Sequence, residues 1–175
     1  MRTLSEVRDF ALLAHGTQKY GELPYIVHLD DVAEVADRFE LHYAIQIAAY
    51  LHDILEDTKV EFSSIRAVFG LEIANLVRLV TDEPGKNRKE RHRLTYPKTR
   101  TNTYAVALKL CDRIANVESC LNTKSSLISM YQREYPEFKE ALHTDGEWTE
   151  MWARLDDLLM RGVPFGSSSH YLPSP

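Results

Sequence analysis

Histidine and carboxylate side chains interrupt three stretches of the sequence that are otherwise apolar. His28 ends a short apolar run, His52 and Asp53 continue the apolar stripe of one predicted helix, and Asp112 lies on the apolar side of another. Ionised carboxylates left unpaired in a core are strongly destabilising, so they need a compensating cation. One divalent ion bound by His28, His52, Asp53 and Asp112 would supply that charge and hold three helices together.

The residue types narrow the choice of ion. Two imidazoles and two carboxylates, completed by water, suit manganese, iron or another octahedral first-row ion better than a closed structural zinc site. A structural role is the alternative for each residue taken alone, since a buried histidine is usually a hydrogen-bonded core residue and Asp112 could pair with Arg113 or Lys109. Four such residues on separate buried helices favour the metal site.

Two further carboxylates, Glu56 and Asp57, follow His52 and Asp53 at steps of three and four, which places them on the same side of a continuous helix. They could instead be an ordinary helix end, although acidic residues near a helix C-terminus oppose the helix dipole.

The elements that must position these residues are helices. Apolar residues recur at steps of three and four along most of the chain, strand signals are scarce, and the helix containing His52 is apolar on nearly every face, which is typical of the centre of a core. We expect an all-α, compact multi-helix bundle of seven or eight helices. The expected helices cover residues 4–14, 29–39, 42–57, 62–69, 71–80, 101–121, 125–143 and 145–160, residues 15–27 form a loop, and residues 86–100 form either a loop or a short exposed helix.

Length and composition limit the class of protein. The 175 residues, with 21 Lys+Arg against 26 Asp+Glu and a net charge of −5, predict one domain over residues 1–161 and a flexible C-terminal tail over residues 162–175. The acidic balance argues against nucleic acid as a partner, and no apolar run is long enough to span a membrane. Two cysteines are too few for a disulfide framework, so we expect a cytoplasmic location.

Four sequence blocks, in order, resemble the HD superfamily of metal-dependent phosphohydrolases, and within it the RelA/SpoT-type hydrolase domain of the small alarmone hydrolases and metazoan SpoT homologues. The resemblance covers about residues 5–122. The HD pair alone is a weak signal, whereas the ordered set is specific. The blocks are His15-Gly16-Thr17-Gln18-Lys19-Tyr20-Gly21 with Pro24-Tyr25-Ile26-Val27-His28, Leu51-His52-Asp53-Ile54-Leu55-Glu56-Asp57-Thr58, Phe69-Gly70 to Val80-Thr81, and Leu108 to Asn116.

This resemblance implies an HD-domain fold and a manganese-dependent hydrolase that removes pyrophosphate from the 3′ position of guanosine tetra- or pentaphosphate (ppGpp or pppGpp), the nucleotides of the stringent response. A metal-bound water would be the nucleophile. The resemblance makes His28, His52, Asp53 and Asp112 the metal ligands, and it makes Glu56 and Asp57 the catalytic pair that orients and deprotonates the water.

Substrate contacts are expected from a small group of polar residues. The resemblance makes Asn116 a nucleotide contact. Lys19 and Lys109 could supply charge for phosphate or be ordinary solvated lysines, and Tyr20 could lie beside the base or merely close its loop. The chain departs from the family where Gln18-Lys19 stands in place of two adjacent basic residues.

Other interpretations stay open at this point. The basic run Lys86–Arg100 could be a lid that contributes Arg93 or Lys98 to a polyphosphate, or a solvated segment, which is the simpler reading. The substrate could be another nucleotide or a phosphomonoester. The chain could also be a non-catalytic nucleotide-binding or interaction module, although the Glu56-Asp57 pair argues against that. A small-molecule nucleotide is the expected partner, and a homo-oligomer is compatible with the sequence.

Overall fold

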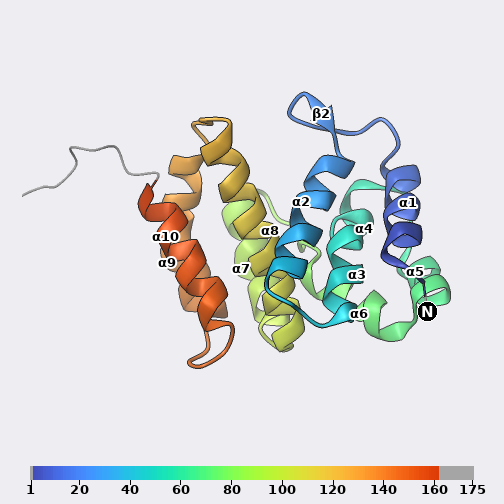
Figure 1. Ribbon diagram of the computed structural model, residues 1–175. Coiled ribbons are helices and arrows are strands. Elements are labelled where there is room, and N and C mark those ends of the chain that lie inside the picture. Colours follow the sequence, from blue (N-terminus) through green and yellow to red (C-terminus); the bar gives the residue numbers. More distant parts are fainter. Residues whose placement is uncertain (1, 162–175) are drawn as a thin grey trace, which may run out of the picture.

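The periodic sequence folds into ten helical segments and one small hairpin within residues 2–161, which are the residues that the computed structural model describes (Figure 1). This confirms the all-α class. The elements are α1 Leu4–His15, β1 Lys19–Tyr20, β2 Leu23–Pro24, α2 Ile26–Arg38, α3 Tyr43–Leu51, α4 Ile54–Asp57, α5 Phe62–Phe69, α6 Leu71–Val80, α7 Arg88–Thr99, α8 Thr103–Asn122, α9 Ile128–Leu142 and α10 Thr149–Arg161.

Three helices form the centre of the bundle. Six of the nine residues of α3 are buried, and α3 packs against α1, α2, α6 and α8. The helix α8 buries eleven of its residues and also packs against α2. Helices α1 and α5 lie at one end of the bundle, and α9 and α10 lie at the other (Figure 1). The all-round apolarity of residues 43–51 therefore marks a central helix, as expected.

A two-stranded hairpin occupies part of the segment that we expected to be a loop. Lys19 pairs with Pro24 and Tyr20 pairs with Leu23 in antiparallel register. Gly21 begins the two-residue turn with φ of 59°, a conformation that two-residue hairpin turns need and glycine adopts without strain. The following helix, α2, begins at Ile26, three residues earlier than the sequence indicated.

The prediction of one continuous helix over residues 42–57 is wrong. Helix α3 ends at Leu51, and a new helical turn, α4, begins at Ile54. The ring of His52 gives a physical reason, because its Nδ1 lies 2.8 Å from the carbonyl oxygen of Ala49, which the backbone of Asp53 would use in a continuous helix. The Asp53 carbonyl then accepts the backbone N–H groups of the next turn.

The basic run is a helix with one buried face, α7. Thr95, Tyr96 and Thr99 are buried, and the Thr99 hydroxyl donates to the carbonyl of Leu79 on α6. Of the two alternatives for residues 86–100, the helical one is correct, but the helix is not wholly exposed because these three residues are buried. This helix and the separate turn α4 account for the difference between the eight helical ranges expected and the ten observed within residues 2–161.

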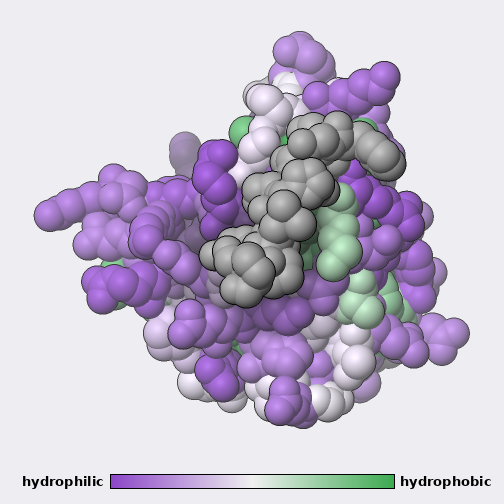
Figure 2. All heavy atoms as spheres, turned by 90° about the vertical axis from the view of Figure 1, so that its left-hand side faces the viewer, coloured by the Kyte–Doolittle hydropathy of each residue, from purple (hydrophilic) through white to green (hydrophobic). Residues whose placement is uncertain are grey.

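The surface that carries α9 and α10 is mostly hydrophilic, with a few apolar side chains (Figure 2). Ion pairs cross this side of the bundle, including the one between Arg154 of α10 and Glu118 of α8. Within residues 2–161, no helix is both long and apolar enough to cross a bilayer. The predicted tail, residues 162–175, lies outside the described part of the chain.

Candidate metal centre

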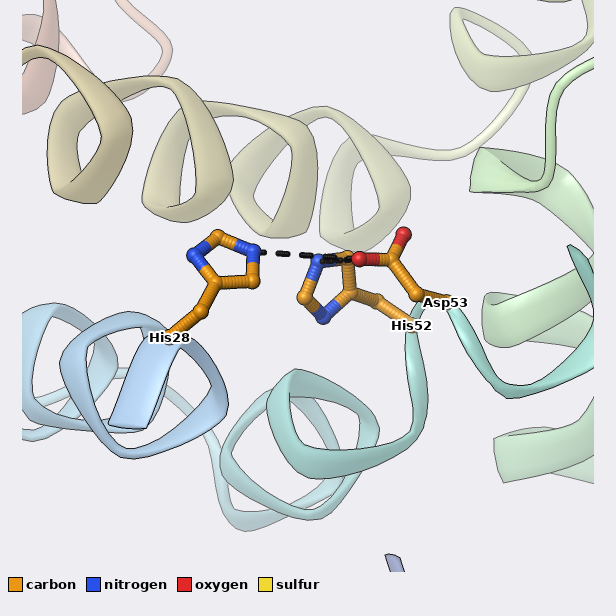
Figure 3. A group of neighbouring side chains, drawn as sticks. All are labelled: His28, His52 and Asp53. Carbon is orange, nitrogen blue, oxygen red and sulfur yellow. Dashed lines mark ion pairs between the residues drawn. The ribbon is translucent and has the colours of Figure 1, made fainter. Parts of the chain in front are cut away.

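Three parts of the fold bring the predicted ligands to one place. His28 lies in the first turn of α2, His52 and Asp53 form the junction between α3 and α4, and Asp112 lies midway along α8. Both histidines are almost fully buried, and the two aspartates are about one-fifth exposed. In Figure 3, both imidazole rings and the Asp53 carboxylate point toward one another from α2 and the junction.

The ligand atoms converge on a single position. His52 Nε2 lies 3.0 Å from Asp53 Oδ2, and His28 Nε2 lies 3.7 Å from the same oxygen. Asp112 Oδ1 lies 3.6 Å from His28 Nε2 and 3.8 Å from His52 Nε2. Ligand atoms bound side by side to one first-row ion, with bonds of about 2.1 Å, lie about 3 Å apart. The ligand atoms of His28, His52 and Asp53 all lie within 4.8 Å of one another, which is compatible with a shared metal ion, and Asp112 borders this group through its contacts with both histidines.

The hydrogen bonding of His52 fits a metal ligand. Its Nδ1 donates to the backbone carbonyl of Ala49, so Nε2, which faces the carboxylates, is the nitrogen available to a metal ion. This Nε2 atom is fully buried and makes no well-aligned hydrogen bond among the described residues, although Asp53 Oδ2 lies 3.0 Å away. A buried imidazole nitrogen that faces two carboxylates fits a ligand of a divalent cation.

Burial and the neighbouring charges act on the pKa values of the two histidines. Burial alone would lower the pKa of His52, but the adjacent Asp53 carboxylate more than offsets this effect and raises that pKa to about 9. Burial lowers the pKa of His28, and the neighbouring His52 lowers it further. The Asp53 and Asp112 carboxylates thus favour a positive charge beside His52, which a bound cation would supply.

Tyr25, for which the sequence predicted no role, supports the centre. Its hydroxyl donates to Asp53 Oδ2 at 2.5 Å. Its ring stacks on His15, with centroids 4.6 Å apart, and meets the ring of His28 edge-on at 5.6 Å. Because Tyr25 immediately precedes α2, it links the hairpin to two of the predicted ligands.

Glu56 and Asp57, the two carboxylates that follow His52 and Asp53 in the sequence, have different hydrogen-bond partners. Glu56 Oε1 accepts the backbone N–H of Asp82 at 2.6 Å, and Asp57 Oδ2 accepts the side-chain amide of Gln18 at 2.8 Å. Desolvation raises the pKa of Glu56 to about 7, and the negative charge of Asp53 adds to this. Glu56 is therefore suited to accept a proton near neutral pH. Neither Gln18 nor Asp82 was singled out from the sequence as a partner of these carboxylates.

Tyr20 and Asn116, both expected to contact substrate, bind each other. The Tyr20 hydroxyl donates to Asn116 Oδ1 at 2.8 Å, and Asn116 Nδ2 donates to Asp112 Oδ1 at 2.5 Å. The Tyr20 ring also stacks on His28. The two residues are thus part of the surroundings of the metal centre.

The two lysines expected near phosphate differ in placement. Lys109 is mostly buried, donates to the carbonyl of Val80 at 3.1 Å and lies 3.8 Å from Asp82 Oδ1. The Lys19 side chain is exposed and forms neither a hydrogen bond nor an ion pair with any residue of the described range. Lys98, one of the lid candidates, is paired with Glu83.

A cavity of about 540 Å³ opens between α2, α8 and α10, and its α8 lining includes Ala115 and Ser119 but not Asn116. Asp31, Arg38 and Arg154 are among its charged lining residues. Pockets that bind small molecules commonly have volumes of about 300–1,000 Å³. The cavity has the volume of a small-molecule pocket, but none of the four predicted ligands lines it.

Comparison with known proteins places this geometry in a family. The model of the HD domain matches residues 8–137. The guanosine-3′,5′-bis(diphosphate) 3′-pyrophosphohydrolase of Drosophila melanogaster is 30% identical over 118 residues, which cover 64% of this chain and 66% of that protein. The Aquifex aeolicus enzyme of the same name is 34% identical over 158 residues, which cover 83% of this chain and only 22% of that protein.

The fold comparison agrees with the sequence comparison. A solved structure described as a metazoan orthologue of SpoT that hydrolyses ppGpp superposes with a TM-score of 0.77 at 23% identity, and the match covers 90% of this chain and 94% of that one. The family match extends over most of the chain and includes all four converging side chains. This chain therefore belongs to the HD domain family.

Proposed function

We propose that this protein is a manganese-dependent phosphohydrolase that removes pyrophosphate from the 3′ position of guanosine 3′,5′-bis(diphosphate). The observation that carries the proposal is the convergence of His28, Asp53 and Asp112 on the buried Nε2 atom of His52. The pyrophosphohydrolase names of the Drosophila and Aquifex relatives support this choice of substrate.

The four ligands would hold one divalent ion, and manganese suits their two nitrogens and two carboxylate oxygens. Such an ion lowers the pKa of a bound water and screens charge that develops on phosphorus. In the overall reaction, water adds to the phosphorus that is attached to the ribose 3′ oxygen. The bond between this phosphorus and the 3′ oxygen breaks, and guanosine 5′-diphosphate and pyrophosphate are released.

The protein's own contribution is proton transfer and positioning. Glu56, with a pKa near 7, accepts a proton from the attacking water. The backbone N–H of Asp82 donates to Glu56 Oε1 and holds the carboxylate in place. Asp57, fixed by Gln18, orients the water. Asn116 would contact the nucleoside, and Lys109 would contribute positive charge near the phosphates.

Domain extent and location complete the proposal. We infer that residues 1–161 form the single HD hydrolase domain. A cytoplasmic location is consistent with Cys111 and Cys120, which are both buried and unpaired with each other.

A nucleotide panel tests the proposed function. The purified protein, loaded with Mn²⁺, is incubated with guanosine 3′,5′-bis(diphosphate), with other phosphorylated nucleotides and with a simple phosphomonoester, and both pyrophosphate and orthophosphate are measured. We expect pyrophosphate from the first substrate. Preferred turnover of another compound would assign a different substrate, and binding without any turnover would identify a non-catalytic module.

A further inference from the structure

The two histidines of the centre are held in different ways. His52 is fixed by a hydrogen bond from its Nδ1 to the backbone of Ala49. Within residues 2–161 no hydrogen bond fixes the ring of His28, whose contacts at the site are its ion pairs with Asp53 and Asp112 and its aromatic neighbours. A metal-binding histidine is normally oriented through its second nitrogen, so something else must orient His28.

Aromatic rings provide that orientation. Tyr20 stacks on His28, with ring centroids 4.7 Å apart and an interplanar angle of 19°. Tyr25 meets His28 from another direction, with centroids 5.6 Å apart and an angle of 65°. Two rings at these angles restrict rotation of the imidazole, and such contacts add to the stabilisation that burial provides.

The hydroxyl of the same tyrosine reaches a second ligand. Tyr20 donates to Asn116 Oδ1, and this leaves Asn116 Nδ2 directed at Asp112 Oδ1. That oxygen of Asp112 is the one that faces both histidines, at 3.6 and 3.8 Å. One side chain of the hairpin thus contacts a ligand on α2 directly and reaches a ligand on α8 through one intermediary.

We propose that Tyr20 is a positioning residue of the metal centre, which holds His28 with its ring and Asp112 through Asn116. The inference rests on the metal site of the proposed function and gives Tyr20 a role other than contact with the substrate. Residues that orient metal ligands typically contribute about 10–100-fold to metal affinity. Tyr20 is therefore expected to affect metal binding when no substrate is present.

Metal titration in the absence of nucleotide tests this role. Mn²⁺ is titrated calorimetrically into metal-free wild-type protein and into the variants Tyr20→Phe and Tyr20→Leu. Phenylalanine keeps the stacked ring and loses the hydroxyl, and we expect its Kd for Mn²⁺ to rise about tenfold. Leucine loses both contacts, and its Kd is expected to rise toward about a hundredfold.

Tyr43→Phe is the matched control, because the Tyr43 hydroxyl also donates a hydrogen bond of 2.8 Å, but to the backbone of Arg2, and Tyr43 begins α3 whereas His52 follows its last residue. Its Kd should equal that of the wild type. Thermal unfolding in chelator shows whether each variant is folded, and Tyr20→Phe alone decides the matter if the leucine variant is not.

The outcomes separate this inference from the proposed function. A wild-type protein that binds no Mn²⁺ overturns the metal site and the role of Tyr20 together. If the wild type binds Mn²⁺ and Tyr20→Phe binds it equally well, the positioning role is wrong while the metal site stands. An unchanged Kd for Mn²⁺ together with a raised KM would assign Tyr20 to the substrate instead.

Discussion

Replacing Glu56 by glutamine removes the proposed proton acceptor while keeping the shape of the side chain. The amide oxygen of glutamine can still accept the Asp82 N–H that Glu56 accepts at 2.6 Å, so the loop at Asp82 should stay in place. Glu56 is not among the four converging ligands, so metal affinity should not change. General base catalysis contributes about 10²–10⁴-fold to rate, which corresponds to about 2.7–5.4 kcal/mol in the barrier.

The assay is pyrophosphate release by Glu56→Gln under saturating substrate and Mn²⁺, together with calorimetric titration of Mn²⁺. We expect kcat to fall at least a hundredfold with an unchanged Kd for the metal. Glu83→Gln is a suitable control, because Glu83 follows Asp82 directly and pairs with Lys98 instead of facing the ligands. Full turnover by Glu56→Gln with metal bound would refute the assignment of Glu56 as the base.

The pH profile gives a second readout of the same group. A general base must be ionised, so activity rises as pH increases through the pKa of Glu56, which desolvation raises to about 7. A bound divalent cation favours the ionised form, so the acid limb of kcat/KM is expected at or below about pH 7. This limb should be missing from the residual activity of Glu56→Gln. An identical limb in the variant would show that another group titrates.

Two further variants test a hydrogen bond at the site and a buried ion pair between α8 and α9. Gln18→Leu removes the side-chain amide that donates to Asp57, and a hydrogen bond to a charged group contributes about 1.5 kcal/mol. Steady-state kinetics should therefore show a kcat about tenfold lower, with metal affinity unchanged. An unchanged kcat would contradict the role of Gln18. Glu134→Ala leaves the buried Arg113 without its carboxylate partner, so the free energy of unfolding, measured in urea, should fall by about 3 kcal/mol. Glu137→Ala breaks an exposed ion pair with Lys89, so the free energy of unfolding should fall by at most about 1 kcal/mol. Equal losses in these two variants would contradict the argument from burial.

The helical architecture was largely predictable because it depends on local periodicity. The apolar faces of α3 and α8 are visible in the sequence, and both helices are central. The break at His52 and Asp53 was not predictable in the same way, because the residues around it continue a helical pattern. It depends on one side-chain hydrogen bond to the Ala49 carbonyl. The basic composition of residues 86–100 likewise concealed the few residues, such as Tyr96, that pack α7 onto the bundle.

The ligand residues could be named from the sequence because charged groups on an apolar helix face are costly and therefore informative. The contacts that support them could not be predicted. Gln18 reaches Asp57 across 39 positions of sequence, and Tyr20 reaches Asn116 across 96. Tyr20 and Asn116 could be named only as expected substrate contacts, and nothing in the local sequence indicates that they bind each other. Only the packing of the hairpin against the bundle reveals what they contact.

The central claim is that this protein releases pyrophosphate from guanosine 3′,5′-bis(diphosphate) in a reaction that depends on Mn²⁺. The most direct test measures this release with and without Mn²⁺, for the wild type and for Asp53→Ala. Asp53 faces both histidines and accepts the hydroxyl of Tyr25, so its loss should abolish metal binding. We predict Mn²⁺-dependent pyrophosphate release by the wild type and none above background by Asp53→Ala. Equal release by the variant, or release by the wild type in chelator, would contradict the account.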